Sequence, residues 1–156
     1  KMEKEIIFLV VLDDSQEMFR ALRYDARRSS RNNGRVALLY TFDTLEFSHW
    51  KAVEDIAEVE SREKAEEKIA EYENFVMSFT EKKPKKFIMK GDRVECIIKF
   101  LEANNFISNF VLAASEKSSP SDSLISSFTG KNRSKIKVPL TILPSSLSEE
   151  EIDKLS

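Results

Sequence analysis

The chain has 156 residues, of which 41% are apolar and 33% charged, a balance that is typical of one globular domain and excludes a disordered chain. Its 25 lysines and arginines nearly offset its 27 aspartates and glutamates, so the overall charge predicts binding neither to nucleic acid nor to an anionic membrane. The longest apolar run, residues 6–12, is far shorter than the roughly 20 residues that span a bilayer.

The first part of the chain predicts two buried strands joined by a helix. Residues 6–12 are continuously apolar, which indicates a strand covered on both faces, as in a parallel sheet. Asp14, with Glu17 three residues later, is typical of a helix N-cap, and Gly34 is expected to end this helix. Residues 36–42 predict the second buried strand.

A long amphipathic helix is expected next. Apolar side chains recur every three or four residues from Trp50 to Phe79, which predicts one helix with a single buried stripe. Residues 82–86 contain four lysines and a proline and are expected to end it. Residues 87–89 then predict a short third strand.

The remaining chain continues the alternation of strands and helices. Asp92, three residues before Glu95, predicts the start of another helix, and residues 106–114 predict the fourth strand. A weaker helical pattern covers residues 122–134. Residues 138–143 predict a fifth strand, at an edge of the sheet or with its start at the proline.

The order of these elements predicts an α/β fold with a five-stranded, parallel, doubly wound sheet. Ser148 and Glu151 form a capping-box pattern, which predicts a C-terminal helical tail. We expect residues 1–144 to form the domain and residues 145–156 the tail. Such sheets bind ligands at the carboxyl ends of strands where the strand order reverses, which places Asp13, Thr41 and Ser115 near the expected site.

With this order of elements, the chain resembles the universal stress proteins over residues 5–144. The likeness rests on Leu12-Asp13-Asp14-Ser15-Gln16-Glu17, on the helix around residues 50–81, on Lys90-Gly91-Asp92 and on Lys137-Val138-Pro139-Leu140-Thr141-Ile142-Leu143. The resemblance implies a sheet of nucleotide-binding-like topology and a homodimer that pairs through residues 138–143. It also implies a binding and regulatory protein rather than an enzyme. The single cysteine, Cys96, separately indicates the reducing cytoplasm as the location.

Universal stress proteins divide into members that bind ATP and members that do not. Binders carry the pattern Gly-x2-Gly-x9-Gly-Ser after the fourth strand, and its glycines fall here on Ala114, Lys117 and Ser126 or Ser127. Asp13 matches the family's acidic residue near adenosine. The resemblance therefore implies a degenerate nucleotide site at Asp13, Thr41, Ala114, Lys117 and Ser127, with no bound cofactor. The alternative is an ATP- or AMP-binding member whose phosphate loop has degenerated.

Enzyme classes fit the sequence less well. The pair Asp13-Asp14 is also found in phospho-acceptor receiver domains, but these need another aspartate after the third strand, where this chain has Met89-Lys90-Gly91. Pyrophosphate-binding enzymes of the wider α/β group carry Ser-Gly-Gly-x-Asp-Ser after the first strand, and these glycines are missing here. His49 and Cys96 are single, so we expect no zinc site and no catalytic residue, and Cys96 is interpreted as a packing residue. One cysteine also excludes an internal disulfide, as is usual in a reducing cytoplasm.

Two polar groupings have more than one interpretation. Hydroxyl side chains crowd residues 115–129, where they form either a polar loop or an anion site at a helix start. Four arginines share one face of the first predicted helix, and we interpret them as a solvated face, with an acidic protein partner or a phosphate as the alternative. They are Arg20, Arg23, Arg27 and Arg31.

Overall fold

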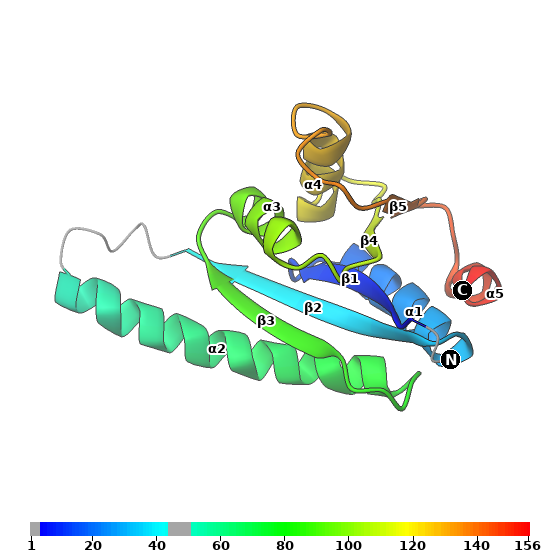
Figure 1. Ribbon diagram of the computed structural model, residues 1–156, viewed down its shortest axis with the longest axis horizontal. Helices are drawn as coiled ribbons and strands as arrows, with labels where there is room; N and C mark the ends of the chain where they lie inside the picture. Colours follow the sequence, from blue (N-terminus) through cyan, green and yellow to red (C-terminus); the bar gives the residue numbers. More distant parts are fainter. Residues whose placement is uncertain (1–3, 44–50) are drawn as a thin grey trace.

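The computed structural model describes residues 4–43 and 51–156, with only the backbone described at residues 51–54. Its five strands form one parallel sheet in the order β3-β2-β1-β4-β5 (Figure 1). The strands are β1 Ile6–Leu12, β2 Gly34–Phe42, β3 Lys85–Lys90, β4 Asn109–Ala113 and β5 Leu140–Leu143. The helices are α1 Gln16–Arg31, α2 Lys51–Met77, α3 Arg93–Ala103, α4 Pro120–Thr129 and, after the last strand, α5 Glu149–Leu155. The predicted fold, including its C-terminal helix, is confirmed.

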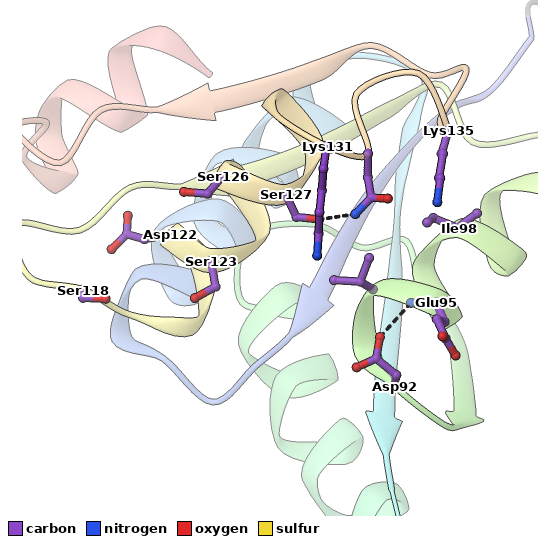
Figure 2. Close-up of a pocket in the computed structure, with 12 residues that line it drawn as sticks. Asp92, Glu95, Ile98, Ser118, Asp122, Ser123, Ser126, Ser127, Lys131 and Lys135 are labelled. Carbon is purple, nitrogen blue, oxygen red and sulfur yellow. Dashed lines mark hydrogen bonds between the residues drawn. The ribbon is translucent and has the colours of Figure 1, made fainter.

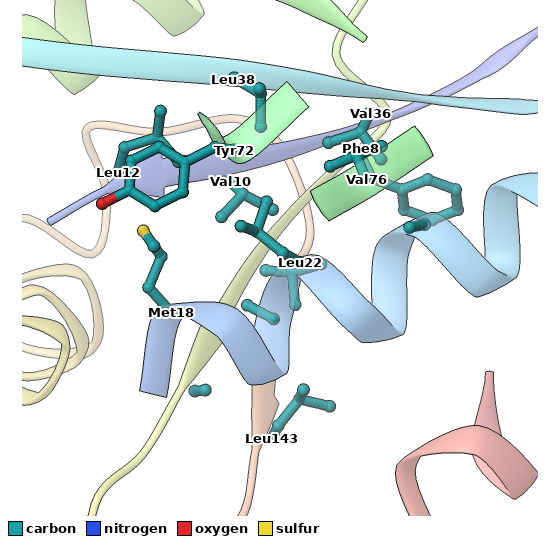
Figure 3. Packing of buried hydrophobic residues seen from close by; sticks show 14 of the residues in the cluster. Phe8, Val10, Leu12, Met18, Leu22, Val36, Leu38, Tyr72, Val76 and Leu143 are labelled. Atoms are coloured by element: carbon teal, nitrogen blue, oxygen red, sulfur yellow. The ribbon is translucent and has the colours of Figure 1, made fainter. Parts of the chain in front are cut away.

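Two apolar cores lie on opposite faces of this sheet. Phe8, Val10 and Leu12 of β1 pack towards α1 and α2 (Figure 3), whereas the residues between them pack towards α3 and α4. Successive side chains of a strand point to opposite faces, so a strand at the centre of the sheet must be apolar throughout. This explains the unbroken apolar run of β1.

The buried stripe of α2 is formed by side chains at helical spacing, Ala65, Ile69, Tyr72 and Val76. The helix ends at Met77, where the last turn tightens: Ser78 N donates to Phe75 O and Phe79 N to Val76 O, each three residues back, at 3.2 and 3.0 Å. Trp50, at the predicted start of the helix, lies outside the described residues. None of the helices within residues 4–43 and 51–156 is long and apolar enough to cross a membrane.

Several predicted boundaries are corrected. The fourth helix is Pro120–Thr129 rather than residues 122–134, because Ser119 caps it, proline suits its first turn and the chain leaves the helix at Gly130. β5 starts at Leu140 because Pro139 has no amide hydrogen, and only its carbonyl pairs, accepting from Phe110 N at 2.9 Å.

The strand boundaries differ for similar reasons. β4 begins at Asn109 rather than at residue 106, because residues 105 and 106 form a turn after α3, which Ile107 N closes by donating to Asn104 O at 3.4 Å. β2 begins at Gly34, and β3 extends over Lys85–Lys90. Both strands are longer than predicted because their pairing with the neighbouring strand continues past the apolar residues.

The inner face of α1 contains a buried carboxyl group. Asp25 and Ser29, one helical turn apart, are 0% and 1% exposed. Neither carboxyl oxygen of Asp25 has a hydrogen-bond partner in the described part of the chain, nor has the hydroxyl of Ser29. Burial raises the pKa of Asp25 well above its usual value, and the opposing effect of Arg28 is smaller. Asp25 is therefore held in its neutral form over a wider pH range than an exposed aspartate.

Candidate functional site

The order of the strands reverses between β1 and β4. From β1 the chain moves to β2 and β3 on one side, and then returns to β4 and β5 on the other. The segments that leave the carboxyl ends of β1 and β4 are therefore neighbours, as in other doubly wound sheets at the point where ligands bind. The side chains at these two ends define the candidate site.

Asp13, the residue directly after β1, is buried and joins the two segments. One carboxylate oxygen accepts from Ser15 N at 2.9 Å and from Ser15 Oγ at 2.5 Å. The other accepts from Ser121 Oγ, on α4, at 2.6 Å. Asp13 is thus already bonded to hydroxyl groups at the starts of both α1 and α4.

Asp14 points to the α2 side of the sheet, whereas Asp13 is bonded to α4 on the other side. The prediction that Asp14 is the N-cap of α1 is wrong. Ser15 is the N-cap, and its hydroxyl accepts from Met18 N at 3.2 Å. Because Asp13 holds Ser15, Asp14 is left in the left-handed region with φ 61°. Its carboxylate accepts a hydrogen bond from the hydroxyl of Tyr72 on α2. Burial, followed by this contact, raises the pKa of Tyr72 well above its usual value.

The loop between β4 and α4 is closed around another carboxylate, that of Asp122. Asp122 accepts from the backbone amides of Ser115, at 3.2 Å, and Ser119, at 3.0 Å, and also from the hydroxyl of Ser115. Ser119 and Asp122 together form a capping box at the start of α4. The hydrogen bond from the Ser115 side chain, followed by those from backbone amides, holds the pKa of Asp122 below its usual value. The carboxylate of Asp122 therefore occupies two amides of this loop, those of Ser115 and Ser119.

An open cleft near the carboxyl ends of the strands lies between α3 and α4 and has a volume of about 820 Å³ (Figure 2). Sequence reasoning identified Ser126 and Ser127 in this region, but missed most of the α3 side. The only sequence signal for the α3 side was that Asp92 starts a helix at the carboxyl end of the sheet. Charged lining residues are the carboxylates Asp92, Glu95 and Asp122 and the ammonium groups Lys131 and Lys135.

The five predicted nucleotide-site residues do not line one cavity. Ser127 lines the cleft between α3 and α4, where its hydroxyl accepts from Asn132 Nδ2 at 2.7 Å. Ala114 and Lys117 line a smaller pocket of about 320 Å³ together with Arg20. Asp13 and Thr41 are buried, and Thr41 lies near the carboxyl end of β2, opposite Met89 in the register.

The described residues offer few groups for catalysis. Within residues 4–43 and 51–156 no three His, Cys, Asp or Glu side chains are placed to hold a metal ion. Cys96 is buried on α3, and burial raises the pKa of its thiol, which disfavours the reactive thiolate. His49 lies outside the described residues.

The fold defines a Rossmann-like α/β domain. The universal stress protein family matches residues 7–144, and the chain belongs to this family. None of the curated proteins matches the sequence significantly.

Solved structures of low sequence identity share the fold. The hypothetical protein MJ0577 superposes with a TM-score of 0.73 at 20% identity, over 94% of this chain and 100% of that one. The universal stress protein UspA from Lactobacillus plantarum gives 0.65 at 16% identity, over 91% and 99%. A universal stress protein in complex with cAMP gives 0.60 at 12% identity, over 90% and 98%.

Proposed function

We propose that this universal stress protein is a regulatory binding module that has no catalytic turnover of its own and binds Mg-ATP weakly or not at all. The observation that carries the proposal is the position of Asp122, whose carboxylate accepts the amides of Ser115 and Ser119 at the end of β4. An incoming phosphate would have to displace this carboxylate or remain beside it, and both cost binding free energy.

Two further features support weak ATP binding. The positions that are glycine in ATP-binding members are Ala114, Lys117 and Ser126 or Ser127, so side chains stand where amides would approach phosphates. The cleft between α3 and α4 has three carboxylates against two ammonium groups, so it does not favour a polyanion.

Titration calorimetry with Mg-ATP tests the proposal. We expect binding to the wild type that is detectable only at about millimolar concentrations of Mg-ATP and, in Asp122→Asn, an affinity about tenfold higher, since the substitution removes the competing charge. Asp92→Asn is the matched control, because Asp92 lines the same cleft and caps α3 through Glu95 N but holds no amide of the loop after β4. A low-micromolar dissociation constant for the wild type would overturn the proposal. So would ATP hydrolysis above background that Asp13→Ala abolishes.

The runner-up is an ATP- or AMP-binding protein with a degenerate loop. The volume of about 820 Å³ favours it, as do Lys131, Lys135 and Asn132 along one wall of the cleft. The cAMP-bound neighbour shows that one protein of this fold accepts a nucleotide. If the wild type binds AMP and Lys131→Glu does not, this second function replaces the first.

The proposal includes a homodimer that pairs through residues 138–143. The two edges of the sheet differ: β3 has the exposed lysines Lys85, Lys86 and Lys90, which discourage strand pairing, whereas β5 exposes Ile142. Symmetric pairing of two copies of β5 would cover this side chain and satisfy the open backbone groups.

The remaining parts of the proposal concern organisation and location. We assign residues 1–144 to the domain, residues 145–156 to a tail, and the protein to the cytoplasm, where the buried free thiol of Cys96 is stable. The near-neutral net charge favours neither nucleic acid nor a membrane as a partner. The remaining class of partner is another protein.

A further inference from the structure

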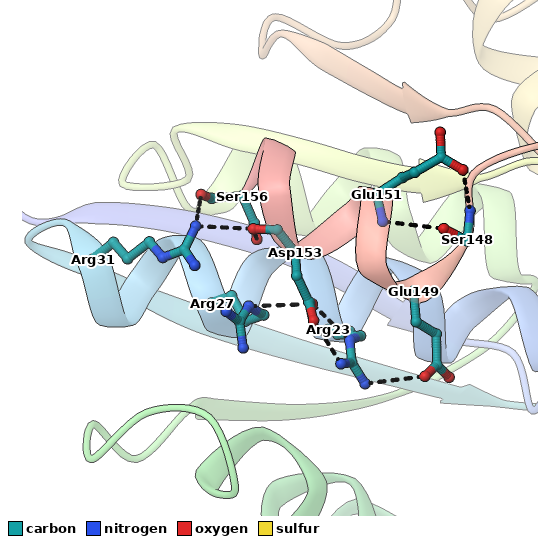
Figure 4. Close-up of polar contacts among 8 residues, drawn as sticks. All are labelled: Arg23, Arg27, Arg31, Ser148, Glu149, Glu151, Asp153 and Ser156. Carbon is teal, nitrogen blue, oxygen red and sulfur yellow. Dashed lines mark hydrogen bonds and ion pairs between the residues drawn. The ribbon is translucent and has the colours of Figure 1, made fainter.

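The four arginines of α1, Arg20, Arg23, Arg27 and Arg31, form what we call the arginine row, and the tail covers part of this row, so it is not wholly a solvated face. Arg23, Arg27 and Arg31 contact the tail helix α5, which lies along α1 (Figure 4), and Arg20 contacts the segment just before α5. Sequence reasoning found their shared face from the spacing, but not what covers it.

One carboxylate of the tail, that of Asp153, pairs with two of these four arginines. Asp153 receives two parallel hydrogen bonds from Arg23, at 2.7 and 2.8 Å, and an ion pair from Arg27 Nε at 3.2 Å. Arg31 donates to the backbone oxygens of Asp153 and Ser156, at 2.9 and 2.6 Å. The hydrogen bond with Arg23 holds the pKa of Asp153 below its usual value. The contact has the fork geometry by which arginine recognises carboxylates.

The rest of the contact between tail and domain is small. Of the seven residues of α5, all of them described, Ile152 alone is buried. Arg23, Arg27 and Asp153 keep 23%, 29% and 23% of their side-chain surface exposed, so water and salt reach the ion pairs. A seven-residue helix is also too short to be stable away from the domain. Such an element is among the first to detach from a folded protein.

Two arginines of the row also have contacts that do not involve the tail. The guanidinium group of Arg23 lies 5.1 Å from the centre of the Phe79 ring, a contact that does not involve the tail. Arg20 links the tail to the candidate site, because it donates to Pro144 O and Leu147 O, at 2.7 and 2.8 Å, and to Ala114 O at the end of β4, at 3.1 Å. Departure of the tail therefore changes the bonding of Arg20 beside the loop after β4.

We propose that α5 is a displaceable helix and that the arginine row beneath it is a docking surface for an acidic helical segment of a partner protein. The partner segment would present a carboxylate in place of Asp153 and, one residue before it, an apolar side chain in place of Ile152. Charge complementarity selects this occupant, since four guanidinium groups favour carboxylates over neutral or basic segments. The inference does not depend on whether the candidate site binds a nucleotide.

The test uses the full chain with Asp153→Ala, which removes the carboxylate that holds the tail. Amide exchange should become faster in α5 and at Ser115, whereas Lys154→Ala, at an exposed ion pair with Glu150, should change neither. Asp153→Asn is the milder variant if the alanine protein folds poorly. Unchanged exchange in α5 would show that the tail is not held in this way and would overturn the proposal.

A labelled synthetic peptide with the sequence of residues 144–156 serves as the acidic helical probe. It should bind the Asp153→Ala chain at least about tenfold more tightly than the wild type, in which the attached tail competes at high effective concentration. A peptide with Asp153→Ala should lose about tenfold in affinity, and added salt should weaken binding. No binding to the variant would overturn the proposal.

Two other results would assign the row to a different occupant and also overturn the proposal. If sedimentation shows that Asp153→Ala forms larger assemblies that the peptide disperses, the row accepts the tail of a second copy. If a single-stranded oligonucleotide binds the variant as tightly as the peptide, the row recognises charge alone.

Discussion

The buried carboxyl group of Asp25 predicts an unusual dependence of stability on pH. Asp25 is fully buried, its oxygens have no partner in the described part of the chain, and its pKa is raised well above 3.8 by desolvation. Its contribution to stability is complete below the unfolded pKa and is lost as pH rises towards the folded pKa, because the unfolded chain releases the proton first. In that window the free energy of unfolding falls by about 1.4 kcal/mol per pH unit from this group alone.

Asp25→Asn removes the titration and keeps the size of the side chain. The buried amide adds an offset, since it too is without partners, but the offset does not change with pH. Urea unfolding of both proteins, measured at intervals from pH 4 to pH 7, should therefore give a difference in free energy that shifts in favour of the variant by about 1.4 kcal/mol per unit, until the folded pKa is passed. Two curves that run parallel over this range would refute the reasoning.

Three further predictions concern the tail, the sheet edge and a glycine. The hydrogen bond with Arg23 lowers the pKa of Asp153, so the contribution of Asp153 to stability is lost as pH falls. The stability advantage of the wild type over Asp153→Asn should therefore shrink on acidification, which is the opposite direction to that of Asp25. An advantage that stays constant with pH would contradict this. Ile142→Lys should place a charge in the β5 edge and give a monomer by light scattering at micromolar concentration, whereas Met77→Lys, equally exposed on α2, should leave the mass unchanged. Gly91 has φ 137° and a Cβ there would lie 3.2 Å from Cys96 Sγ, so Gly91→Ala should lower stability by about 1–3 kcal/mol in urea, and an unchanged midpoint would count against strain at this position.

The parts of the fold that were predictable are those in which local pattern and tertiary environment agree. The apolar run of β1 indicated burial on both faces, and Asp92 and Ser148 were identified as helix caps from the acidic residue three positions later. These signals lie within a few residues of one another. They are therefore complete in the sequence before any long-range contact forms.

The errors and omissions involve contacts between distant residues. Asp14 matches the N-cap pattern as well as Ser15 does, and the choice is made by Asp13, which bonds to Ser15 and, across 108 positions, to Ser121. Asp153, the tail carboxylate that pairs with Arg23, lies 130 positions further along the chain. Spacing along a helix shows which residues share a face, but one sequence does not show what that face meets.

The central position of β1 has a consequence for the order of folding. Its neighbours come from opposite ends of the chain, β2 shortly after it and β4 about a hundred residues later, as the bond between Ile7 N and Ser108 Oγ illustrates across 101 positions. The β1, β2 and β3 strands can pair early, but β1 then keeps one edge open until β4 arrives. During synthesis this edge stays exposed until residues 109–113 leave the ribosome, which makes the late appearance of β4 the step at which the chain is most open to misassociation.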